Sequence, residues 1–179
     1  AIGLSMAFYA VYDRIVPAKN KYMATLFNTS ATRKVVVSRI YRVNSQLTAV
    51  VGVLLDQELR FITARTAGTA VTIQREDTAD TLSAGITADH ASTAVTEGTG
   101  DRALIRRFSA VNEEYVLATL ANTITGGTAL LHDAQLIWWR GGWSKGLVLR
   151  QNQGVTIKNL TNSVVGSVSY AIVFDDEPI

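Results

Sequence analysis

The stretch VSYAIVF, residues 168–174, decides the fold because its side chains alternate in character along the chain. Val168 begins a set of apolar side chains that recurs at every second position as far as Phe174. In an extended chain these side chains all point to one face, and the residues between them point to the other. The stretch therefore predicts a β-strand that buries one face in a core.

Other segments are also typical of strands, because they are short, rich in Val, Ile and Thr, and bounded by Gly, Asn, Asp and Ser. They lie at 33–43, 52–63, 69–75, 102–111, 114–120, 134–140, 146–150 and 154–160. No long helical pattern separates them. The sequence thus predicts an all-β protein, an antiparallel β-sandwich or jelly roll of about eight or nine strands.

The segment at 52–63 shows how two faces of a strand divide, since apolar side chains alternate there with charged ones, including Asp56 and Glu58. The preceding segment offers two basic residues, Arg39 and Arg42. We therefore expect acid–base pairs between these neighbouring strands. Each pair would contribute at most about 1 kcal/mol and would mainly help to select the register.

The first 21 residues precede the strand pattern, and their first part is apolar. They could form a short helix or strand on the core of their own domain. The interpretation that we adopt is an N-terminal arm at 1–21 that lies on a neighbouring subunit, followed by a single sandwich domain at 22–179. The residues of the arm that we expect to make this contact are Ile2, Leu4, Phe8 and Tyr9.

Residues 76–102 differ from the rest, because they are small, polar and rich in Thr, Ala, Gly and Asp. A loop of this length within a compact domain is usually functional or disordered. We expect this segment to be held by contacts with neighbouring subunits, or to contain a short strand around Ile86 or Val95.

The sequence contains no motif of a catalytic, cofactor or metal site. The two histidines, His90 and His132, each stand beside an aspartate, but neighbours on a strand point to opposite faces. There is no G-x-S-x-G motif, no H-E-x-x-H motif, no glycine loop with a phosphate-binding lysine, and no cysteine. We therefore expect no catalytic residues, no cofactor and no metal, and a protein that is not an enzyme.

Charged residues make up only 18% of the 179 residues, against about 25% in a typical soluble domain. Such a low proportion indicates surface that contacts protein rather than water. The 17 basic residues are nearly balanced by 15 acidic ones, so direct nucleic-acid binding is not expected. No apolar run approaches the roughly 18 residues of a membrane span, so no membrane span is expected.

All three tryptophans lie in the stretch LIWWRGGWSKG, residues 136–146. Strand alternation sends Trp138 and Trp139 to opposite faces, and a turn at the following pair of glycines allows Trp143 to fold back. Two aromatic side chains on one exposed face would suit stacking against sugars or bases. At a contact between subunits they would instead be anchors of the interface. We favour the interface, with Trp139 and Trp143 as its candidate residues.

Two stretches resemble small β-sandwich proteins of phage and phage-like virions. One is YMATLFNTSATRKVVVSRIYRVNSQLTAVVGVLLDQELRFITA at 22–64, and the other is GLVLRQNQGVTIKNLTNSVVGSVSYAIVFDDEP at 146–178. The second stretch contains a hairpin, a turn and a last alternating strand with an acidic end. This order is similar to that of capsid decoration, cement and single-jelly-roll capsid proteins. The resemblance rests on this order of elements rather than on a chemical motif.

The resemblance implies a virion structural protein that self-assembles at the surface of a capsid. Its expected partners are further copies of the chain, as a trimer or larger, and other capsid proteins. The expected location is the virion. A carbohydrate-binding module of a fibre or spike, with its site at Trp138–Trp143, is the alternative, and glycan binding is kept open. A β-sandwich enzyme is the third possibility and ranks last.

Overall fold

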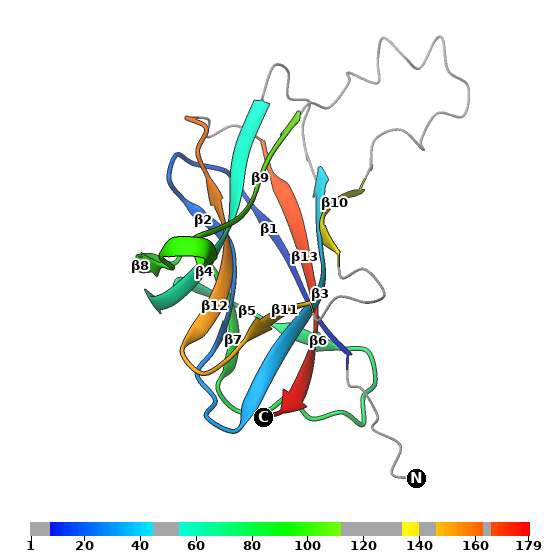
Figure 1. The fold of residues 1–179 in the computed structure, drawn as a ribbon. Coiled ribbons are helices and arrows are strands. Elements are labelled where there is room, and N and C mark those ends of the chain that lie inside the picture. Colours follow the sequence, from blue (N-terminus) through cyan, green and yellow to red (C-terminus); the bar gives the residue numbers. More distant parts are fainter. Residues whose placement is uncertain (1–7, 45–53, 112–133, 140–145, 163–165) are drawn as a thin grey trace, which may run out of the picture.

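The computed structural model describes residues 8–44, 54–111, 134–139, 146–162 and 166–179. The described part of the chain is all-β, with two antiparallel sheets packed against each other. Figure 1 shows the sheets as two layers, with β13 in one layer and β12 in the other. This arrangement confirms the predicted antiparallel β-sandwich.

Sheet A contains six strands in the order β10, β3, β13, β1 and β6, with β11 also paired to β3. Their bounds are Ala134–Trp139 for β10, Arg33–Asn44 for β3, Val168–Pro178 for β13, Phe8–Ile15 for β1, Ile73–Arg75 for β6 and Leu147–Leu149 for β11. Thus β10 is an edge strand, whereas β13 and β1 lie inside the sheet.

Sheet B contains seven strands in the order β5, β7, β2, β12, β4 and β8, with β9 also paired to β4. Their bounds are Thr69–Val71 for β5, Ile86–His90 for β7, Tyr22–Asn28 for β2, Gln153–Asn159 for β12, Leu54–Thr66 for β4, Thr93–Glu97 for β8 and Leu104–Val111 for β9. A short 3₁₀ helix at Gly100–Arg102 precedes β9. The described residues therefore form thirteen strands rather than eight or nine.

The core lies between the sheets and follows the predicted alternation. On β13, the four apolar side chains from Val168 to Phe174 are buried, and those between them are half-buried. In the other sheet, Leu55 and Leu59 of β4 are fully buried in the same core. The strand predicted at 114–120 lies outside the described residues.

The predicted N-terminal arm is wrong from residue 8 onward, because this segment belongs to the sandwich. Residues 8–15 form β1, which pairs with β13 over its whole length and with β6 on its other edge. Tyr9, predicted to contact another subunit, is only 1% exposed and stacks on Phe174 within its own core. The reason is the alternation of β1, which places Tyr9 and Val11 among the buried side chains. Ile2 and Leu4 lie outside the described residues, and for Phe8 only the backbone at the start of β1 is described.

The predicted ion pairs between 33–43 and 52–63 are also wrong, because β3 and β4 belong to different sheets. Asp56 instead pairs with Arg107 of the adjacent strand β9, and Glu58 pairs with Arg60. Consecutive segments were assumed to be neighbours, but the chain passes from one sheet to the other between them.

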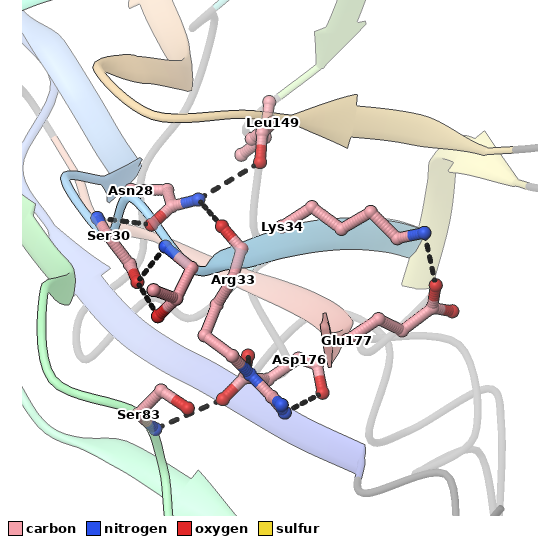
Figure 2. A network of polar contacts seen from close by, with 9 residues as sticks. Asn28, Ser30, Arg33, Lys34, Ser83, Leu149, Asp176 and Glu177 are labelled. Carbon is pink, nitrogen blue, oxygen red and sulfur yellow. Dashed lines mark hydrogen bonds and ion pairs between the residues drawn. The ribbon is translucent and has the colours of Figure 1, made fainter. Parts of the chain in front are cut away.

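A polar network holds the end of the sandwich where β13 finishes (Figure 2). Asn28 donates from Nδ2 to the carbonyl oxygens of Arg33 at 2.9 Å and Leu149 at 3.1 Å. Arg33 donates from Nε to Asp176 Oδ1 at 2.7 Å, and the backbone N–H of Ser83 donates to Asp176 Oδ2 at 3.0 Å. The acidic end of β13 is therefore bonded to two other parts of its own chain, β3 and the segment that contains Ser83.

Candidate functional site

The strand register gathers large exposed side chains on the outer face of sheet A. One row across the sheet consists of Leu136, Tyr41, Ala171 and Tyr12, on β10, β3, β13 and β1. The next row consists of Trp139, Arg39, Val173 and Ala10 on the same strands. We call the surface formed by Tyr12, Tyr41, Leu136 and Trp139 the aromatic face.

The aromatic face is exposed. Tyr12 is 61% exposed, Trp139 58% and Leu136 43%. Contiguous apolar side chains of this size at the surface usually mark a contact with another molecule. The edge position of β10 also favours a contact with another molecule, because one side of that strand has no hydrogen-bonded neighbour among the described residues.

A bulge in β10 produces this arrangement. The register of β10 against β3 shifts between Leu136 and Trp138, and Ile137 is buried at the shift. After the shift, Trp138 packs against the core and Trp139 faces outward opposite Arg39. The predicted divergence of the two tryptophans is thus confirmed, whereas their role at an interface stays a prediction. Trp143 lies outside the described residues.

The outer face of sheet B is different, because part of its own chain lies over it. Residues 91–98, which we call the strap, contain β8. At one end of the strap, the N–H of Ala91 donates to the carbonyl of Tyr22 on β2 at 2.8 Å. At the other end, the N–H of Gly98 donates to the carbonyl of Phe61 on β4 at 2.7 Å. The strap, which is part of the segment predicted to contact other subunits or to contain a short strand around Ile86 or Val95, is therefore held within its own subunit. Strands occur at both positions, as β7 and β8.

Buried polar side chains lie beneath the strap and are bonded to one another. Thr25 Oγ1 is 2.8 Å from Thr156 Oγ1 and 3.0 Å from Ser92 Oγ, and all three residues are at most 5% exposed. Ser92 also donates to Asp89, whose carboxylate pairs with Arg65 at 2.5 Å. Burial lowers the pKa of Arg65, although the nearby Asp89 acts to raise it. This network fastens the strap rather than offering a binding surface.

Glu97, at the end of β8, connects the strap to three strands. It accepts hydrogen bonds from Tyr22 at 3.1 Å and Lys158 at 2.8 Å, and it pairs with Arg60. Burial acts to raise the pKa of Glu97, but the hydrogen bonds from Lys158 and Tyr22 and the charges of Lys158 and Arg60 hold the pKa below its usual value. The ionised carboxylate therefore stabilises the folded state.

We expect Glu97→Gln to lower the free energy of unfolding by up to about 1 kcal/mol near pH 7, since Glu97 is partly exposed. A lowered pKa in the folded state means that this contribution is present above about pH 4.5 and is lost as the pH falls through the folded pKa. Urea titrations at several pH values should show the two proteins converging in acid. Glu76→Gln, at an exposed position, serves as the control. A difference that stays constant down to pH 3 would contradict the assignment.

The acidic and histidine residues do not form a catalytic relay among the described residues. His90 Nδ1 lies 2.6 Å from Asp13 Oδ2 of sheet A, so His90 joins the two sheets rather than pairing with Asp89. Asp89 and Ser92 bond each other, whereas His90 bonds Asp13. His132 lies outside the described residues.

No group of three or more His, Cys, Asp or Glu side chains that could hold a metal occurs in the described ranges. The described ranges also contain no helix that is long and apolar enough to span a membrane.

The sequence reasoning missed Tyr12, Tyr41, Leu136 and Arg39. A signal for Tyr12 was present, because FYAVYDRI at 8–15 alternates as a strand does and places Tyr12 opposite in direction to Tyr9. Tyr41 and Leu136 could not be assigned to the same row as Tyr12, because this assignment requires the order of strands in the sheet.

The fold and the aromatic face define a class, a β-sandwich protein with one outer face covered by its own strap and the other bearing exposed aromatic side chains. Comparison of the chain with protein-family models, curated proteins and solved structures finds no significant match to any of them.

Proposed function

We propose that this protein is a structural subunit that assembles with further copies of itself through the aromatic face of sheet A. The exposure of Trp139, together with that of Leu136 and Tyr12 on the same outer face of sheet A, carries the proposal. Tryptophan and tyrosine are enriched among the residues that supply most of the energy of protein interfaces. The low proportion of charged residues supports the same conclusion, because it leaves much of the surface suited to contact with protein.

The structure of sheet B supports the choice of face. The strap bonds outer side chains of sheet B within the subunit, whereas three of the large exposed apolar side chains among the described residues, Tyr12, Leu136 and Trp139, belong to sheet A. Arg39 and Arg14 flank the aromatic face, and Arg39 lies opposite Trp139. In a contact between copies, these guanidinium groups could stack on tyrosine or tryptophan rings of the other copy.

We place this assembly at the surface of a virion, in a capsid, decoration or cement role, as a homo-oligomer of three or more copies. The order of strands and turns at 22–64 and 146–178 supports this placement through its resemblance to such proteins. Negative-stain microscopy of the purified protein tests it. Closed shells would support a capsid subunit, and discrete small oligomers would support a decoration role. A monomer at high concentration would contradict both.

The central test is Trp139→Ala. We expect it to weaken self-association by about 2 kcal/mol or more, or roughly thirtyfold in Kd, because an aromatic anchor of the interface is removed. Analytical ultracentrifugation measures the association, and circular dichroism and thermal unfolding show that the subunit remains folded. Leu104→Ala is the matched control, since Leu104 is 45% exposed but belongs to β9 of sheet B.

Glycan binding is the second candidate function, and the exposed Trp139 and Tyr12 on one face are the observation that favours it. If Trp139→Ala leaves the oligomer unchanged but abolishes binding on a glycan array, the aromatic face is a carbohydrate site. Such a result would overturn the assembly proposal.

A further inference from the structure

Arg42 is a buried cation inside the sandwich, and none of the ion pairs among the described residues neutralises it. It lies on β3, near the end of the sandwich opposite to the network of Figure 2, and is only 3% exposed. It takes part in no ion pair of the described residues. A buried charge without a counter-charge is costly, so an anion bound beside it would be held by that charge.

An uncharged polar side chain, that of Tyr170, lies opposite Arg42 on β13. Burial lowers the pKa of Arg42, and Tyr170 acts to raise it. Gln57 of sheet B donates from Nε2 to the hydroxyl oxygen of Tyr170 at 2.5 Å. Burial raises the pKa of Tyr170 far above its usual value, so the phenol stays neutral and supplies no negative charge to Arg42. These residues form a buried polar bridge between the two sheets.

The unused hydrogen-bonding atoms of this bridge are mostly donors. Nε and Nη2 of Arg42 are buried and have no hydrogen-bond partner. Nε and Nη2 form the side of the guanidinium that binds carboxylate or phosphate with two parallel hydrogen bonds. The tyrosine oxygen accepts an N–H group from Gln57, and Oε1 of Gln57 is an acceptor that also has no partner.

We propose that Arg42, Tyr170 and Gln57 form a binding site for a small free oxyanion, carrying a carboxylate or phosphate group, inside this end of the sandwich. The ligand is small because Arg42 and Gln57 are almost completely buried. The site lies near the end of the sandwich, since Arg42 is two residues from the last residue of β3 and Tyr170 is two residues from the first of β13. This site is separate from the aromatic face and does not depend on the proposed assembly.

The test measures thermal unfolding at constant ionic strength while sodium phosphate or sodium acetate replaces sodium chloride. We expect at least one of these anions to raise the unfolding temperature of the wild-type protein in a saturable way, by roughly 2–4 °C. Arg42→Met should abolish this rise. Arg150→Met, at an exposed arginine, should respond as the wild type does.

A second readout separates this site from a purely structural arginine. In chloride alone, Arg42→Met should unfold at the same temperature as the wild type or higher, because an unpaired buried charge has been replaced by an apolar side chain of similar length. Arg42→Lys keeps the charge but loses the pair of parallel N–H donors. It should require at least a tenfold higher anion concentration to reach half of the rise in unfolding temperature.

Three outcomes would overturn the proposal. The first is a wild-type protein whose unfolding temperature shows no saturable dependence on either anion. The second is an equal response of Arg42→Met and the wild type. The third applies if Arg42→Met does not fold. In that case, an Arg42→Lys protein with the same half-saturating anion concentration as the wild type would overturn the proposal.

Discussion

Replacing Tyr9 with alanine is expected to lower the free energy of unfolding by about 3–5 kcal/mol. Tyr9 is 1% exposed, its ring stacks on that of Phe174 at 5.5 Å between centroids, and β1 lies between two other strands. Truncation would therefore leave a cavity in the core, against the middle of sheet A. Equilibrium unfolding in urea, followed by circular dichroism, measures the change.

Tyr12→Ala is the matched control, because Tyr12 has the same side chain on the same strand but is 61% exposed. We expect its stability to change by no more than about 0.5 kcal/mol, and its effect to be on self-association instead. If both variants were equally stable and both failed to assemble, residues 8–15 would act as an arm after all.

Asp89→Ala is the second substitution for which we expect a large effect, a loss of about 3–5 kcal/mol of stability. The side chains of Asp89 and Arg65 are only 2% and 7% exposed, so the change leaves a buried arginine without its counter-charge. It also removes the carboxylate that accepts hydrogen bonds from Ser92 and from the N–H of Gly68. Urea unfolding again provides the measurement.

A double variant and a surface control make this prediction specific. Asp89→Ala combined with Arg65→Met should recover much of the lost stability, since no unpaired charge remains. Asp56→Ala breaks a pair with Arg107 in which the side chains are 30% and 60% exposed, and it should cost less than about 1 kcal/mol. Equal losses for Asp89→Ala and Asp56→Ala would show that the network under the strap adds little.

The fold class could be predicted from the sequence because burial repeats with a period of two along β13 from Val168 to Phe174, and this period is a local property. The positions of β3, β10, β11 and β12 were also found to within a few residues. The role of β1 was not, because an apolar segment near the start of a chain can be an arm or a strand. The difference depends on its pairing with β13, which lies far away in the sequence.

The candidate site was predictable only in part, for the same reason. Trp139 was found because two adjacent tryptophans on a strand must diverge. Its neighbours on the aromatic face come from four strands, and only the order β10, β3, β13, β1 places them together. Arg42 was predicted to pair with an acid of 52–63, because the sequence does not show that β3 and β4 belong to different sheets.

The central place of β13 in sheet A has a consequence for biosynthesis. β1 and β3 are made early on the ribosome, yet the strand that joins them is the last of the described strands to be made. Until residues 168–178 emerge, each of the two early strands has an edge whose hydrogen bonds are unmade and open to wrong partners. A nascent chain of this protein therefore cannot complete sheet A step by step, and its folding within the cell must wait for the end of translation of this region.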